Sequence, residues 1–73
     1  MYILANDNIY LIKKLRNVNV YKLMKMLING KYQFMRYELA QSYDEATLYF
    51  FPTIKTQKID RRTVKKIQEG INV

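Results

Sequence analysis

The chain contains no cysteine and no histidine. Without cysteine there is no disulfide bond, and without either residue type Cys/His metal sites and nucleophiles paired with histidine are excluded. Six carboxylates remain, but Asp44 and Glu45 share a predicted turn and the other four are scattered. The sequence therefore predicts a protein that is not an enzyme and that holds neither a metal nor another cofactor.

Long apolar runs are also missing. The longest run has about five residues, whereas a helix that spans a bilayer needs about 20. The first residues, Met-Tyr-Ile-Leu-Ala-Asn-Asp, lack the basic segment that opens a secretory signal. We therefore expect no membrane partner and a cytoplasmic location, which is the host cytoplasm if a phage encodes the protein.

The length and composition are those of one small folded domain, residues 1–73. Hydrophobic residues make up 49% of the chain, enough for a core, and the 26% of charged residues is typical of folded domains. Asn, Lys, Ile and Tyr, all read from A/T-rich codons, together supply 30 of the 73 residues. This bias indicates an A/T-rich genome, and we expect a phage or another mobile element as the source.

The clearest helical pattern lies in residues 19–29. Asn19 can cap the N-terminus with its side-chain oxygen, and Gly30 stands where a residue with positive φ commonly ends a helix. Between them, apolar residues recur at helical spacing. They are Val20, Leu23, Met24, Met26, Leu27 and Ile28. The spacing predicts a helix over 19–29.

A β-hairpin is predicted next, with arms 31–41 and 46–55 joined by a turn at 42–45. Strict alternation divides its side chains between two faces. One face holds Met35, Tyr37, Leu39, Leu48, Phe50, Pro52 and Ile54. The other holds Tyr32, Phe34, Arg36, Glu38, Tyr49, Phe51, Thr53 and Lys55.

The C-terminal segment predicts a second helix, residues 61–69. Asp60 is its N-cap, Val64 and Ile67 form its buried stripe, to which Ile71 can add, and Gly70 ends it. The basic residues of this segment are left facing outward.

Residues 1–17 allow two structures. A hairpin can turn at 6–8, or a strand can precede a helix that is capped by Asp7 and ends at Arg16. We favour the hairpin, because Ile and Tyr prefer strands and two Asn residues flank the Asp at the turn.

These elements together predict an α+β fold, a small antiparallel sheet in ββαββα order with helices at 19–29 and 61–69. Residues 8–29 also allow a helix-turn-helix with 17–19 as its turn and the following hairpin as a wing. That arrangement loosely resembles the winged-helix regulators of phages and mobile elements. Lys13 and Arg16 depart from its pattern, because an apolar and a small residue are expected there.

Positive charge is concentrated near the C-terminus. The formal net charge is +7, and six of the thirteen Lys and Arg residues lie between 55 and 66. A concentrated imbalance of this kind favours a polyanionic partner. The candidate phosphate contacts are Lys55, Lys58, Arg61, Arg62, Lys65 and Lys66, with Lys22 and Lys25 second.

Four aromatic residues of the predicted hairpin, Tyr32, Phe34, Tyr49 and Phe51, share one face with two cations. Such a face can stack the bases of a single-stranded nucleic acid. It can equally be a second core layer, and we favour the core because a sheet between two helices buries both faces.

The leading prediction for function is a small, basic, non-enzymatic nucleic-acid-binding protein. The alternative is an inhibitor that binds a host or defence protein, as anti-CRISPR and host-takeover proteins do. Its basic residues would then meet an acidic protein surface, and the four aromatic residues would form the core of the interface.

Overall fold

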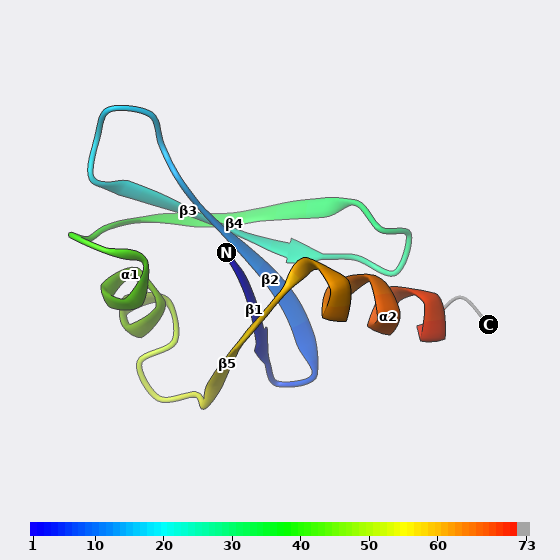
Figure 1. Ribbon diagram of the computed structural model, residues 1–73. Helices are drawn as coiled ribbons and strands as arrows, with labels where there is room; N and C mark the ends of the chain where they lie inside the picture. The colour runs from blue at the N-terminus through cyan, green and yellow to red at the C-terminus, as the bar shows by residue number, and fades with distance from the viewer. Residues whose placement is uncertain (72–73) are drawn as a thin grey trace.

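The computed structural model describes residues 1–71, which form an antiparallel sheet of five strands and two helices (Figure 1). The strands are β1 (Tyr2–Ala5), β2 (Asn8–Lys14), β3 (Val20–Met26), β4 (Tyr32–Leu39) and β5 (Thr56–Ile59), and the helices are α1 (Tyr43–Phe50) and α2 (Arg61–Ile71). The strands lie in the order β4-β3-β2-β1-β5. The predicted α+β class is confirmed, whereas the observed element order is ββββαβα instead of ββαββα.

Each face of the sheet is covered by one helix, and Figure 1 shows α1 and α2 on either side of the strongly twisted strands. On the α1 face, Ile3, Ile12 and Leu23 are buried together with Ala46 and Phe50 of α1. The face opposite, the α2 face, buries its own set of side chains. They are Ile9 and Leu11 of the sheet and Val64 of α2.

The predicted N-terminal hairpin is confirmed. β1 and β2 pair antiparallel from Tyr2 opposite Leu11 to Ala5 opposite Asn8. The two residues between them, Asn6 and Asp7, have φ angles of 50° and 62°. Positive φ at both positions is the geometry of a tight type I′ turn, and Asn and Asp tolerate it better than other side chains do. The alternative helix up to Arg16 does not form, because most of that segment, Asn8–Lys14, is strand β2.

The predicted helix at 19–29 is wrong, because this segment is the central strand β3. β3 pairs with both β2 and β4, and its backbone bonds to two neighbours outweigh the helical spacing of its apolar residues. The helix-turn-helix at 8–29 and its winged-helix arrangement are excluded for the same reason. Gly30 does have the expected positive φ, 82°, but it lies in the β3–β4 turn and not at a helix end.

The second arm of the predicted hairpin, 46–55, is also wrong. Residues 43–50 form α1, and the turn expected at 42–45 is the capped start of that helix. The Ser42 hydroxyl accepts from the Glu45 backbone N–H at 3.1 Å, and the Glu45 carboxylate accepts from the Gln41 backbone N–H at 3.2 Å. The spacing S-x-x-E is that of a capping box: Ser42 satisfies one N–H of the first helical turn, while Glu45 reaches back to the N–H of the residue before the cap. Pro52 follows the helix end at Phe51, a common place for proline.

A β-bulge at Met35 divides β4 into two parts. Phe34 pairs with Met24 and Arg36 with the adjacent Leu23, so one residue of β4 is extra. The bulge reverses the alternation of side chains beyond it. Phe34 and Tyr37 therefore share the α2 face, while Arg36 turns to the α1 face, contrary to the predicted alternation.

On the α1 face, Arg36 fastens α1 to the sheet. Its guanidinium donates to the carbonyl oxygens of Tyr49 at 3.0 Å and Phe50 at 3.3 Å, and it pairs with Glu38 at 2.6 Å. The last turn of α1 carries no basic residue. Arg36 thus supplies from β4 the positive charge that the carbonyl end of a helix favours.

The predicted C-terminal helix is confirmed, and it runs two residues further than expected, from Arg61 to Ile71. The Asp60 carboxylate caps it by accepting from the Thr63 backbone N–H at 2.7 Å. Val64 is buried, as predicted, whereas Ile67 is only half-buried and does not join the core. Gly70 lies within the last turn and does not end the helix.

Replacing Phe51 with Ala is expected to cost about 3–5 kcal/mol of unfolding free energy, because its side chain is 7% exposed and packs edge-on against Tyr10 at 4.9 Å. Urea unfolding measures this loss. Tyr49→Ala, at a position 46% exposed, is the matched control and should cost less than about 1 kcal/mol. Similar costs for the two variants would contradict the assigned core.

Replacing Arg36 with Ala is expected to cost about 1–3 kcal/mol, because two helix carbonyls lose a charged donor. The control is Arg62→Ala, which removes the same charge from an exposed position in the first turn of α2. The control should be neutral or slightly stabilising, since a helix N-terminus disfavours cations. Equal losses in urea unfolding would show that Arg36 does not hold α1.

Candidate nucleic-acid interface

The six cations between 55 and 66 do not form one patch. Lys55 lines a shallow cavity beside the β1–β2 turn, together with Asn6 and Asp7. Lys58 pairs across the sheet with Ile3, so it lies on the α1 face. The remaining four belong to α2.

The cations of α2 occupy two edges of the helix. Arg61 and Lys65, one turn apart, line a cavity of about 390 Å³ with Tyr2 and Tyr32 of the α2 face. Burial and a hydrogen bond with Tyr2 raise the pKa of the Tyr32 hydroxyl to about 12. The positive charge of Arg61 acts in the opposite direction and lowers this pKa. The other two α2 cations, Arg62 and Lys66, are exposed and do not line the cavity that Arg61 and Lys65 share with Tyr2 and Tyr32.

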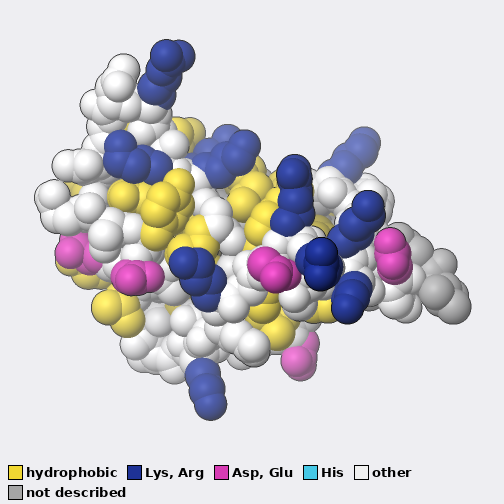
Figure 2. All heavy atoms as spheres, viewed as in Figure 1, with side chains coloured by type: hydrophobic (Ala, Val, Ile, Leu, Met, Phe, Trp, Pro, Cys, Tyr) yellow, Lys and Arg dark blue, Asp and Glu magenta, His cyan; other side chains and the backbone are white. Residues whose placement is uncertain are grey.

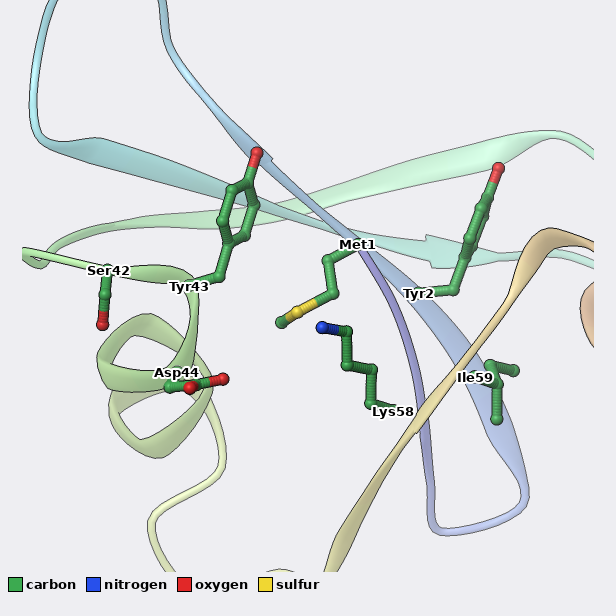
Figure 3. Close-up of a pocket in the computed structure, with 7 residues that line it drawn as sticks. All are labelled: Met1, Tyr2, Ser42, Tyr43, Asp44, Lys58 and Ile59. Atoms are coloured by element: carbon green, nitrogen blue, oxygen red, sulfur yellow. The ribbon is translucent and has the colours of Figure 1, made fainter.

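Lys58 lines a separate cavity of about 510 Å³ between β1, β5 and the start of α1 (Figure 3). Figure 3 shows Lys58 and Asp44 extending toward this space from β5 and α1. Burial, Lys58 and Lys13 lower the pKa of the Met1 ammonium. The Asp44 carboxylate lines the same cavity and supplies negative charge beside Lys58.

The two cations predicted from the segment 19–29 lie on opposite faces of β3. Lys25 pairs with Tyr10 on the α1 face. Lys22 pairs with Lys13 on one side and Tyr37 on the other, all on the α2 face. The Lys22 ammonium lies 5.8 Å from the centre of the Phe34 ring. Only Lys22 of this pair therefore lies beside exposed aromatic rings.

The four predicted aromatic residues also separate. Phe51 is buried against the α1 face, so the core prediction is confirmed for this residue, and Tyr49 is exposed on α1. Tyr32 and Phe34 are 36% and 49% exposed on β4. For these three the core prediction is wrong: Tyr49 points outward from α1, and Tyr32 and Phe34 stay uncovered because 46–55 does not pair with β4.

Tyr37 is the aromatic residue that the predicted alternation placed on the wrong face. Its ring is 52% exposed and its centre lies 4.9 Å from that of Phe34, with the planes tilted by 51°. A bulge was needed to bring these residues together, and no residue type in 32–39 marks its position. We call Phe34 and Tyr37 the aromatic pair.

The aromatic pair belongs to the part of the α2 face that α2 leaves uncovered, which we call the open half. α2 covers the end near Ile9 and Met26 with Ile67. The open half consists of Lys13, Val20, Lys22, Phe34, Tyr37 and Leu39. It combines two cations with exposed flat rings.

The carboxylates lie elsewhere, and all six are within the described chain. Three are on the α1 side: Glu38 on the α1 face, and Asp44 and Glu45 in α1. The other three are Asp7 in the β1–β2 turn, Asp60 at the start of α2 and Glu69 in α2. The strands thus place no carboxylate on the α2 face. Figure 2 shows the Lys and Arg side chains gathered most densely around α2.

Other kinds of site are not seen in the described part of the chain. Residues 1–71 hold no group of three or more Asp and Glu side chains placed to bind a metal ion. Neither helix in this range is long and apolar enough to cross a membrane.

Comparison with protein-family models, with curated proteins and with solved structures finds no match to this chain. Function is therefore inferred from the geometry alone.

The Asp60 cap should make α2 sensitive to acid. Its hydrogen bonds with Thr63 lower the pKa of Asp60. The extra stability from the ionised cap is therefore present above the unfolded pKa, about 4, and is lost as pH falls through the lower folded value. Asp60→Asn keeps a capping oxygen without the charge. The wild type should exceed this variant in melting temperature near neutral pH, and the difference should vanish in acid. A difference independent of pH would contradict this role.

Proposed function

We propose that this protein is a non-enzymatic nucleic-acid-binding protein whose binding surface is the open half together with the Arg61–Lys65 edge of α2. The proposal rests on the kind of groups that meet there. Lys13 and Lys22 supply charge for phosphates, and Phe34 and Tyr37 supply flat rings. Arg61 and Lys65 continue the positive charge beside Tyr32.

One observation carries this proposal: Lys13 and Lys22 are directly paired across β2 and β3 on a sheet face with no carboxylate. Like charges directly opposite each other destabilise a sheet. Lysines that only keep a protein soluble can stand anywhere on the surface and need not face each other. A polyanion bound between Lys13 and Lys22 would remove the repulsion between their ammonium groups. Arg61 at the start of α2, which borders the proposed surface, points the same way, because a helix N-terminus also disfavours cations.

A second candidate function, inhibition of a host or defence protein through an acidic surface, is favoured by the edge of the sheet. β4 pairs only with β3 within the described chain, so its outer backbone groups are free. Its exposed apolar side chains are of types enriched in protein interfaces. They are Tyr32, Phe34, Met35, Tyr37 and Leu39. The paired cations and the missing carboxylates favour nucleic acid over this alternative.

Binding to nucleic acid should weaken steeply with salt. If Lys13, Lys22, Arg61 and Lys65 each neutralise one phosphate, the slope of log K against log salt should be about −3. Replacing Arg61 and Lys65 together with Ala should reduce the slope by about 1.5. Fluorescence anisotropy of a labelled oligonucleotide across a salt series measures both values.

The matched control for that variant replaces Arg62 and Lys66 with Ala. It removes the same charge from the same helix, but from the edge that does not border Tyr2 and Tyr32. Its slope should stay close to that of the wild type. Equal losses in the two double variants would mean that net charge alone drives binding, and no binding at about 50 mM salt would exclude nucleic acid as the partner.

A further inference from the structure

We infer that the nucleic acid is single-stranded and that two of its bases stack on Phe34 and Tyr37. This inference rests on the proposed function and adds the class of ligand and the way it is held. The shared chemistry is an unpaired nucleotide strand, whether RNA or DNA.

The exposure of the aromatic pair supports stacking. Both rings stand on the open half about half exposed, at 49% and 52%, although the fold buries other rings, such as those of Phe50 and Phe51, almost completely. Their planes are tilted by 51°, so they are not stacked face to face on each other. Each ring thus keeps surface for a separate base. Stacking on such rings binds single strands of any sequence, because every base has a flat face.

The positions of the cations fit a strand that runs along β4. Lys22 lies beside both rings of the pair, and at 5.8 Å its ammonium is near the outer limit of contact with Phe34. It is therefore weakly held and free to reach a phosphate. Tyr32 lies further along β4, about 16 Å from Tyr37 at the rise per residue of a β-strand. The Arg61–Lys65 edge of α2 lies beside Tyr32. The surface thus alternates rings and positive charges, as the bases and phosphates of a single strand do.

A duplex fits this surface less well. Its bases are already stacked on one another and present only their edges in the grooves. Against a duplex the two rings would contact backbone and gain no stacking. Lys22, Arg61 and Lys65 would still contact phosphates, so duplex binding is expected to be purely electrostatic and weaker.

The test compares four labelled probes of about 12 nucleotides with one base sequence, namely single-stranded RNA, single-stranded DNA and the duplex of each. We expect tighter binding of single strands than of duplexes. Replacing Phe34 with Ala should weaken single-strand binding roughly 5- to 150-fold, and the same change at Tyr37 should act similarly. Neither change should alter duplex binding more than about twofold, since the rings do not stack on paired bases. The RNA and DNA probes show which strand is preferred.

Two controls separate stacking from other effects. Tyr49→Ala removes an aromatic ring of similar exposure, 46%, from α1 and should leave binding unchanged. Phe34→Leu keeps an apolar side chain without a flat ring, so it should lose single-strand affinity even if Phe34→Ala fails to fold. Upfield shifts of the ring protons of the aromatic pair on titration with a single strand report stacking directly.

Several outcomes would overturn the inference. Equal affinity for single strands and duplexes, with no effect of the Phe34 and Tyr37 variants, would refute stacking. The proposed function would then still stand if the Arg61 and Lys65 variant lowers the salt slope. If the aromatic pair instead joins two copies of the chain, sedimentation would show a dimer that Phe34→Leu dissociates without loss of nucleic-acid affinity. Absence of binding to all four probes would refute both proposals.

Discussion

The bulge at Met35 is the constraint on which both faces of the sheet depend. If Met35 occupied a regular position in the ladder instead of a bulge, Arg36 would share the α2 face with Phe34, and Tyr37 would turn toward α1. The carbonyl end of α1 would then lose its charged partner, and the rings of Phe34 and Tyr37 would be separated by the sheet. One irregularity therefore fixes how α1 docks and also creates the aromatic pair. Structural and proposed functional features are linked through the backbone of one strand.

The two helices cover the sheet unequally, and this leaves a surface free. α1 is held by Arg36 and also by Tyr43, whose ring packs edge-on against Tyr21 at 5.0 Å. α2 reaches the opposite face with a narrow apolar stripe, in which Val64 is buried and Ile67 half-buried. A helix with so narrow a stripe covers only part of a sheet face. The uncovered part contains Phe34 and Tyr37, which would be expected in a core if both faces were fully covered.

Local signals predicted the elements that depend on a few neighbouring residues. The turn at Asn6 and Asp7, the cap at Asp60 and the positive φ of Gly30 all follow from side-chain chemistry within a few positions. The segments 19–29 and 46–55 were wrong because their structure depends on distant partners. β3 is a strand because β2 and β4 flank it. The start of α1 was predictable, since Ser42 and Glu45 have the spacing of a capping box, but the docking by Arg36 depends on a bulge that no residue type marks.

Three of the six carboxylates of this chain serve the fold. Glu38 pairs with Arg36, Glu45 accepts from the Gln41 backbone and Asp60 caps α2. Each contact draws negative charge to the α1 side or to a helix end, so none remains on the sheet face that carries Lys13 and Lys22. Lys13 and Lys22 therefore repel each other, and no carboxylate among the described residues pairs with either of them to relieve this repulsion. If this surface binds nucleic acid as proposed, the bound strand would stabilise the fold, because a ligand that binds the folded and not the unfolded chain shifts the equilibrium toward the folded state. The same surface that weakens the free protein would therefore make its folding stability depend on the ligand.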